Sequence, residues 1–253
     1  QGRDNIINVH VTLVPFVKTS SEFKTKPTQH SVQELRKTGI NPHILLCRSD
    51  NPIDEDTKRK VSVSCGVEAD CVIGIPNAKT VYQVPLHLHN EGILKPIASF
   101  FNLEEIIPAL EGWSSLVDKI LKPTSQIQIA FVGKYVALKE SYKSLIEALI
   151  HAGAHLDVNV KIKWVDSEKL KESTLSTLED CQGILVAGGF GASGVEGKIL
   201  AIGYARENKI PYLGICLGMQ LAVIEFARNV LGIKDANSTE FDEESNNPIV
   251  YLI

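Results

Sequence analysis

The segment 210–220 constrains the fold of this chain more than any other. Its first residues, Ile-Pro-Tyr-Leu-Gly, have the pattern of a short buried strand, and an apolar helix follows over 221–231. Cys216 lies between them, with Gly214 two residues before it and Gly218 two residues after it. Small residues at those positions allow the sharp strand-to-helix turn that exposes a nucleophile. The segment therefore predicts an α/β domain with Cys216 at the end of one strand.

The same alternation of strands and helices extends along most of the chain. The predicted strands are 8–15, 44–47, 71–75, 127–132, 160–165, 183–186 and 210–214, and the predicted helices include 31–38, 54–65, 141–151 and 221–231. Prolines at 96, 108 and 123 interrupt the pattern between the two groups of strands. We therefore predict two doubly wound parallel-sheet domains, 1–95 and 127–253, joined by a linker over 96–126.

Composition and charge argue against several classes of function. The chain has 253 residues, of which 44% are hydrophobic and 22% are charged, as in an ordinary soluble globular protein. Its net charge of -4 predicts no nucleic-acid or membrane partner, and no apolar run approaches the roughly 18 residues of a membrane span. Five cysteines without a CxxC pair argue against a zinc site and favour the cytoplasm. Residues 1–8 lack the pattern of a secretory signal, and we expect the chain to be an internal part of a longer protein.

Cys216 has the surroundings of a nucleophilic thiol. The helix after it directs backbone N–H groups and its positive end towards the sulfur, which favours the thiolate. A thiolate that attacks an amide carbon produces a tetrahedral oxyanion, which needs hydrogen-bond donors. The N–H of Leu217 is one candidate, and the turn Gly188-Gly189-Phe190-Gly191 after the strand 183–186 supplies another. A lone cysteine is ordinarily a core residue and such a turn is ordinarily only a turn, but their occurrence on successive strands favours an active site.

These two runs resemble the class I glutamine amidotransferases, which use a Cys-His-Glu triad. The longer string 214–228, followed by Asn237-Ser238-Thr239-Glu240-Phe241, is similar specifically to the CTP synthase family. That family makes CTP from UTP, using ATP and ammonia released from glutamine. The resemblance covers nearly the entire chain. It implies the C-terminal part of a Rossmann-like, P-loop-type synthetase domain, followed by the N-terminal part of a flavodoxin-like class I glutamine amidotransferase domain.

The resemblance also implies roles for the residues around Cys216. Cys216 would be the nucleophile, and Gly188 and Leu217 would contribute the oxyanion hole. The residues that would contact bound glutamine are Gly189, Leu217, Gly218, Met219, Gln220 and Glu240. Without the resemblance, Glu240 would be interpreted as a solvated loop carboxylate.

A basic loop in the first domain is a candidate for phosphate binding. The run Lys24-Thr25-Lys26-Pro27-Thr28-Gln29 gathers two ammonium groups, two hydroxyls and an amide. We expect the proline to hold this loop extended, ahead of a helix that starts near Ser31. From chemistry alone, two lysines in a loop are most often only solvated. The resemblance alters that interpretation, because the run is similar to the segment with which CTP synthases bind UTP and the inhibitor CTP.

Further nucleotide contacts follow from the resemblance alone. Lys60 falls where the family has another lysine for the pyrimidine nucleotide. Arg48, Asn77 and Ala78 fall where the family contacts the ATP adenine, although Asn77 replaces an acidic residue that is common there. Otherwise, Arg48 and Lys60 would be surface cations.

Several features of the family are missing or altered. No G-x-x-x-x-G-K-[ST] phosphate loop occurs, so the Mg²⁺ ligands that act with ATP are expected outside this chain, with no metal ligand inside it. The catalytic His and Glu of the family lie beyond residue 253, and we expect His151 and His155 to be surface groups. Ser193 stands where the family usually has an arginine. Because serine cannot make the forked contacts of arginine, we expect weak activation by GTP, the allosteric activator that the resemblance implies.

The resulting interpretation is a CTP synthase, a carbon–nitrogen ligase with glutamine as amido donor. Its partners would be UTP, CTP, ATP and glutamine, and the resemblance implies a homotetramer, with filaments as a further assembly. A different class I amidotransferase would not explain the run at 24–29. A non-catalytic nucleotide-binding or filament-forming homologue remains the alternative, and Ser193 is the residue that favours it.

Overall fold

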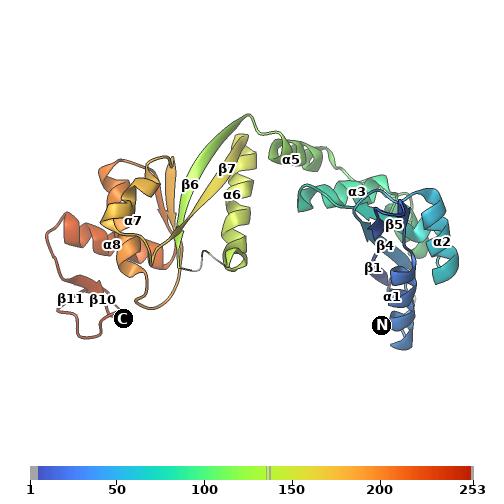
Figure 1. The fold of residues 1–253 in the computed structure, drawn as a ribbon, viewed down its shortest axis with the longest axis horizontal. Coiled ribbons are helices and arrows are strands. Elements are labelled where there is room, and N and C mark those ends of the chain that lie inside the picture. The colour runs from blue at the N-terminus through green and yellow to red at the C-terminus, as the bar shows by residue number, and fades with distance from the viewer. Residues whose placement is uncertain (1–4, 135, 137, 252–253) are drawn as a thin grey trace. The chain divides into compact units, whose positions relative to one another are not determined.

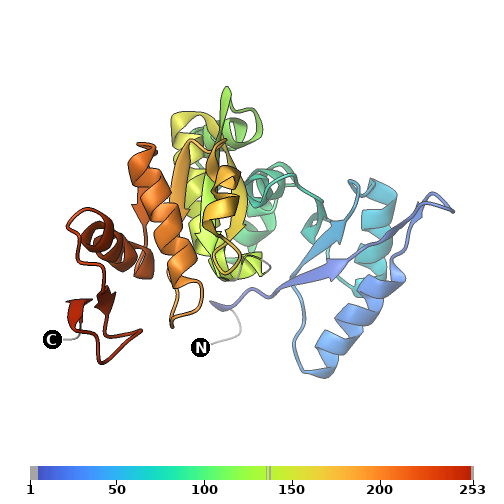
Figure 2. The same ribbon diagram turned by 60° about the vertical axis from the view of Figure 1, so that its left-hand side comes forward.

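The computed structural model describes residues 5–134, 136 and 138–251. The chain divides into two compact units between Leu121 and Lys122. Each unit contains parallel strands connected through helices, which confirms the predicted α/β class (Figures 1 and 2). The segment 96–126, which we predicted to be a linker, contains most of α4 (Leu94–Phe100), all of α5 (Glu111–Leu121) and the first residues of the next strand.

Unit 1 is built on a three-stranded parallel sheet in the order β1-β4-β5, with strands Val9–Leu13, Ile44–Ser49 and Val72–Pro76. The connecting helices α1 (Lys26–Lys37) and α2 (Glu55–Cys65) pack on one face, where Val32 and Val61 meet Leu45. On the other face, Leu88 of α3 (Val84–Asn90) packs with Ile73. The remaining elements are the antiparallel pair β2 (Phe16–Val17) and β3 (Glu22–Phe23) and the 3-10 helices Ala69–Cys71 and Val81–Gln83.

The expectation of an extended loop over 24–29 is wrong. α1 begins at Lys26, well before Ser31, and Pro27 occupies its first turn. Proline fits this position because its φ is already helical and its missing N–H would have had no partner inside the helix. Thr28 is fully buried, and its hydroxyl donates to the carbonyl of Leu13 at 2.9 Å, which fastens the start of the helix to β1.

Unit 2 contains a four-stranded parallel sheet in the order β7-β6-β8-β9. Its strands are Val158–Asp166, Ser125–Gly133, Gly183–Val186 and Tyr212–Gly214. The connecting helices are α6 (Lys143–Leu156), α7 (Val195–Glu207) and α8 (Leu217–Asn229), with 3-10 helices at Lys139–Tyr142 and Glu172–Leu178. A small parallel pair, β10 (Ala236–Ser238) and β11 (Asn247–Val250), follows α8.

Alternate residues of the central strands of unit 2 belong to two separate cores. Phe131 and Leu185 pack with Leu149 of α6, whereas Val132 and Val186 pack in the cluster formed with α7 and α8. Helices therefore cover both faces of the sheet. The edge strand β9 differs from the expectation of a buried strand, because Leu213 is 55% exposed.

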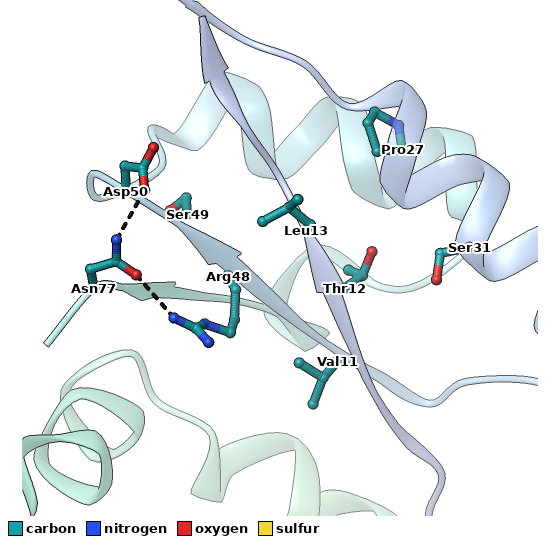
Figure 3. Close-up of a pocket in the computed structure, with 9 residues that line it drawn as sticks. All are labelled: Val11, Thr12, Leu13, Pro27, Ser31, Arg48, Ser49, Asp50 and Asn77. Carbon is teal, nitrogen blue, oxygen red and sulfur yellow. Dashed lines mark hydrogen bonds between the residues drawn. The ribbon is translucent and has the colours of Figure 1, made fainter. Parts of the chain in front are cut away.

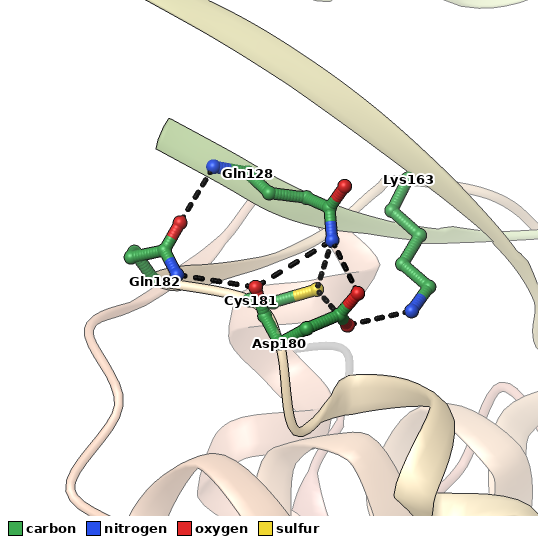
Figure 4. Close-up of polar contacts among 5 residues, drawn as sticks. All are labelled: Gln128, Lys163, Asp180, Cys181 and Gln182. Atoms are coloured by element: carbon green, nitrogen blue, oxygen red, sulfur yellow. Dashed lines mark hydrogen bonds and ion pairs between the residues drawn. The ribbon is translucent and has the colours of Figure 1, made fainter. Parts of the chain in front are cut away.

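A polar cluster joins β6, β7 and the segment just before β8 (Figure 4). Gln128 of β6 donates its backbone N–H to the side chain of Gln182 at 2.7 Å and its side-chain amide to Asp180 at 2.8 Å. Lys163 of β7 pairs with Asp180 at 2.6 Å, and this hydrogen bond is the main cause that lowers the pKa of Asp180. Asp180 and Gln182 immediately precede β8, so they lie at the end of that strand away from the glycine turn.

The model contains no helix, among the described residues, that is both long enough and apolar enough to cross a membrane.

Candidate functional site

Cys216 lies at the junction of β9 and α8 with a backbone conformation that is rare for a residue with a side chain. Its φ is 53° and its ψ is -110°. Such a conformation costs free energy and persists only where the surroundings enforce it. The cysteine is exposed. The structure therefore has the strained strand-to-helix turn that the spacing of Gly214 and Gly218 predicted.

The two glycines are required by close approaches between backbone segments. A Cβ on Gly218 would lie 2.2 Å from the carbonyl oxygen of Val186, and a Cβ on Gly214 would lie 2.6 Å from the carbonyl carbon of Gly218. Neither contact can be relieved by moving a flexible side chain. The turn can therefore pack against β8 only with glycine at both positions.

Tyr212 supports the first turn of α8 through a hydrogen bond to the backbone. Its hydroxyl donates to the carbonyl of Gly218 at 2.6 Å. Burial raises the pKa of Tyr212 well above its usual range, and the negative charge of Glu225 adds to the effect. The phenol therefore remains protonated at neutral pH and keeps its role as donor.

The glycine turn after β8 lies directly beside the cysteine. Val186 and Gly214 are register partners in adjacent parallel strands, and the N–H of Ile215 donates to the carbonyl of Val186 at 3.0 Å. A Cβ on Gly188 would lie 3.3 Å from the Cβ of Cys216. Within the described part of the chain, the N–H groups of Gly188 and Leu217 donate no hydrogen bond to protein atoms. Two candidate oxyanion donors are thus available beside one thiol.

Two of the predicted glutamine contacts have polar groups beside the strand-to-helix turn at Cys216, which we call the elbow. The carboxylate of Glu240, an exposed residue just after β10, accepts from the N–H of Gly191 at 3.2 Å, so the small β10–β11 pair brings it to the glycine turn. Gln220 lies in the first turn of α8, and its side-chain oxygen is buried without a hydrogen-bond partner among the described residues. The other predicted contacts are backbone neighbours of Cys216 and of Gly188: Gly189, Leu217, Gly218 and Met219.

One charged residue beside this site was not predicted from the sequence. Lys198 of α7 is 1% exposed, and its ammonium group donates to the carbonyl of Ala187 at 3.3 Å. Lysines in helices usually lie at the surface, and nothing in the local pattern of α7 marks this one as buried. The only available signal in the sequence is that the other buried residues of α7 are all small or apolar.

Two of the predicted nucleotide-binding lysines, Lys24 and Lys60, act on one carboxylate of unit 1. Lys24 pairs with Glu22, and the pKa of Glu22 is lowered first by this hydrogen bond, with Lys60 of α2 contributing a further charge effect. Lys26 is exposed at the start of α1, and Gln29 donates its side-chain amide to the hydroxyl of Thr25 at 3.2 Å. Thr28 is the exception in this predicted set, because its buried hydroxyl is already bound to Leu13.

Two of the three predicted adenine contacts, Arg48 and Asn77, line a pocket of about 550 Å³ (Figure 3). Arg48 donates to the side-chain oxygen of Asn77 at 2.9 Å, and the amide nitrogen of Asn77 donates to Asp50 at 2.9 Å. The backbone N–H of Asn77 also donates to Ser49 at 3.0 Å, which joins the ends of β4 and β5. Ala78 follows this junction and does not line the pocket.

Comparisons with known proteins agree on one family. The model of the CTP synthase N-terminus matches residues 1–103, and the model of class-I glutamine amidotransferases matches residues 137–250. A CTP synthase of Campylobacter jejuni subsp. doylei is 60% identical over 253 residues, which are 100% of this chain and 47% of that protein. The CTP synthase of Helicobacter pylori is 57% identical over 252 residues, 46% of its length. The chain belongs to the CTP synthase family.

The chain spans about half the length of the curated relatives that it matches. Among solved structures, the glutaminase domain of Trypanosoma brucei CTPS with bound acivicin is 46% identical and covers 50% of each chain. Its TM-score with this chain is 0.48.

Ser193, which stands where we expected an arginine from the family resemblance, contacts the loop after β7. Its hydroxyl donates to the carboxylate of Glu168, in the loop after β7. Gly194, with φ 75°, follows it and begins α7 against Ser167. The serine therefore ties the start of α7 to that loop. His151 and His155 are exposed on α6, as we expected.

We predict that Cys216 is alkylated first when the full-length protein is treated with iodoacetamide at pH 7.5. Burial raises the pKa of Cys47 to about 12, and burial is also the main cause that raises the pKa of Cys65, Cys71 and Cys181. Since the thiolate is the reacting species, those four should react at least about tenfold more slowly. Peptide mass spectrometry over time measures each rate, and equal rates at Cys181 and Cys216 would contradict the assignment.

Proposed function

We propose that this chain is the central part of a CTP synthase, which uses ATP to aminate UTP to CTP with ammonia from glutamine, the final step of de novo pyrimidine nucleotide synthesis. The observation that carries the proposal is the exposed Cys216 on a strained elbow, beside a glycine turn so close that a Cβ on Gly188 would lie 3.3 Å from the Cβ of Cys216. Membership of the CTP synthase family supports both halves of the reaction. A non-catalytic homologue would leave the strained backbone of Cys216 without a role.

The proposed glutaminase step uses the geometry of the elbow directly. The thiolate of Cys216 forms a bond to the side-chain amide carbon of glutamine, and the carbonyl electron pair moves to the oxygen. The N–H groups of Gly188 and Leu217 hold that oxyanion. When the oxyanion collapses, the carbon–nitrogen bond breaks and the protonated nitrogen leaves as ammonia. Water then cleaves the thioester to glutamate and returns the thiol.

Glutamine binding is proposed for the same edge of unit 2. The carboxylate of Glu240 suits the α-ammonium group of glutamine, and the unpartnered side-chain oxygen of Gln220 is a further acceptor for it. The backbone at Gly189, Gly218 and Met219 lines the rest of the elbow. We propose the flavodoxin-like class for this unit and the P-loop type for unit 1.

The pyrimidine nucleotide is proposed to bind near the start of α1. Lys24 and Lys60 both act on Glu22, and Lys26 stands at a helix N-terminus, where orphan N–H groups favour a phosphate. Thr25, Pro27, Thr28 and Gln29 would then form the local frame of the site, with Thr28 in a structural role. The adenine of ATP is proposed at the Arg48–Asn77 pocket, next to Ala78.

The remaining assignments are proposals from the family alone. Mg²⁺ would act with ATP, but no cluster of three or more His, Cys, Asp or Glu side chains in the described residues could hold a metal, so no step here runs through it. We also propose a cytoplasmic homotetramer, and activation by GTP that is weakened by the Ser193–Glu168 contact.

We predict that Cys216→Ala in the full-length enzyme abolishes CTP synthesis from glutamine and preserves synthesis from free ammonia. The reason is that only the first reaction needs the thiol, whereas amination occurs at the nucleotide sites. CTP formation from UTP with each nitrogen source measures the split. Cys181→Ala, which removes a buried thiol from the same unit, should keep both activities. Full glutamine-dependent activity in Cys216→Ala would refute the proposed function.

We predict that Lys26→Ala weakens the binding of UTP and CTP by about tenfold or more. A charge-assisted hydrogen bond contributes on the order of 1.5–3 kcal/mol, and about 1.4 kcal/mol corresponds to a factor of ten. Isothermal titration of the assembled full-length enzyme measures both affinities. Lys37→Ala, at the opposite end of α1, is the matched control and should leave them unchanged. Equal affinities in wild type and Lys26→Ala would mean that Lys26 is only a solvated cation.

A further inference from the structure

The most unusual charged group of unit 2 is the buried ammonium of Lys198. The side chain is 1% exposed and lies beneath the glycine turn that follows β8. Lysine is almost never fully buried unless its charge is paired, because leaving water is costly for an ammonium group. No ion pair to a described carboxylate balances it. A buried cation without such a partner, beside a candidate active site, needs an explanation.

The ammonium group contacts the backbone of the turn itself. Nζ donates to the carbonyl oxygen of Ala187 at 3.3 Å. A Cβ on Gly189 would lie 3.3 Å from Nζ and 3.9 Å from Leu217, so the group fits directly against the turn. A side chain at Gly189 would compete with the ammonium for this space.

The contact with Ala187 controls the direction of the next N–H. The C=O of Ala187 and the N–H of Gly188 belong to one trans peptide, so they point in opposite directions. Because Lys198 holds the carbonyl on its own side, the N–H of Gly188 is directed away from Lys198. Gly188 itself lies beside Cys216, since a Cβ on Gly188 would be 3.3 Å from the Cβ of Cys216.

The surrounding charges are consistent with this arrangement. Burial is the main cause that lowers the pKa of Lys198, and the cation Lys134 lowers it further. Cys216 and Glu240 act in the opposite direction and raise it. Cys216 and Glu240 therefore lie close enough to the ammonium to act on the pKa of Lys198.

We propose that Lys198 is a positioning residue of the oxyanion hole, whose ammonium holds the Ala187 carbonyl so that the N–H of Gly188 faces the oxygen of the tetrahedral intermediate on Cys216. The inference rests on the proposed glutaminase function. It adds a residue that acts through the peptide 187–188 and does not touch the substrate. The consequence is that removing the ammonium impairs the step that forms an oxyanion and spares reactions of the thiol that form none.

The test uses Lys198→Met in the full-length enzyme, because methionine is unbranched and apolar and removes only the donor and the charge. We expect kcat of the glutaminase to fall by about ten- to a hundredfold, less than the 10²–10³-fold loss typical for deleting an oxyanion donor itself. KM for glutamine should change by less than about threefold, because the glutamine contacts remain. CTP synthesis from free ammonia should be unchanged, because amination occurs at the nucleotide sites of unit 1.

Alkylation of Cys216 by iodoacetamide separates positioning from other roles of Lys198. This substitution at saturated carbon needs the thiolate but forms no oxyanion, so its rate should stay within about threefold of wild type. A parallel fall of alkylation and turnover would overturn the proposal and assign Lys198 to thiolate stabilisation. An unchanged glutaminase kcat would overturn it as well.

A second variant covers the case in which Lys198→Met does not fold. Lys198→Gln keeps a polar group, but its amide is one bond shorter than the ammonium, and we expect the same loss of kcat with unchanged alkylation. Wild-type kcat in folded Lys198→Gln would overturn the proposal. A wild-type enzyme without glutaminase activity dependent on Cys216 would instead refute the proposed function, so the two failures are distinguishable.

Discussion

The parallel pairing of β8 with β9 is the interaction on which the candidate site depends. It places Val186 opposite Gly214, and the chain then turns so tightly that Gly218 packs against the carbonyl of Val186. This approach leaves no room for a Cβ, and it enforces the positive φ of Cys216. The strain is local, but the packing that holds it extends to the whole hydrophobic cluster between the sheet, α7 and α8. The exposure of the Cys216 thiol thus depends on the packing of this hydrophobic core.

Chemistry at this elbow depends on backbone groups more than on charged side chains. The N–H groups of Gly188 and Leu217 lack partners in the described structure. Each belongs to a segment in which a side chain holds a nearby backbone carbonyl. Tyr212 holds the carbonyl of Gly218, and Lys198 holds the carbonyl of Ala187. Donors fixed before the reaction need no reorganisation when charge develops, which is the physical basis of an oxyanion hole.

The sequence predicted those parts of the fold and site that local sterics decide. The glycines around Cys216 indicated the turn, and apolar runs located the strands, because both signals lie within a few residues. The start of α1 was predicted wrongly, since Pro27 suits either an extended loop or a first helical turn and the distant contact between Thr28 and Leu13 favours the helix. Lys198 could not be predicted as a site residue, because its burial arises only when α7 packs on the sheet.

The central claim concerns the carbonyl oxygen on the substrate carbon that is bound to Cys216. Two backbone donors hold this oxygen: the N–H of Gly188, just after β8, and the N–H of Leu217, at the start of α8. A crystal structure of the full-length enzyme, trapped as the glutamyl thioester of Cys216, tests it most directly. The account predicts the thioester oxygen within about 3 Å of the backbone nitrogens of both Gly188 and Leu217. A thioester oxygen that points away from both nitrogens, with the carbonyl of Ala187 turned from Lys198, would contradict it.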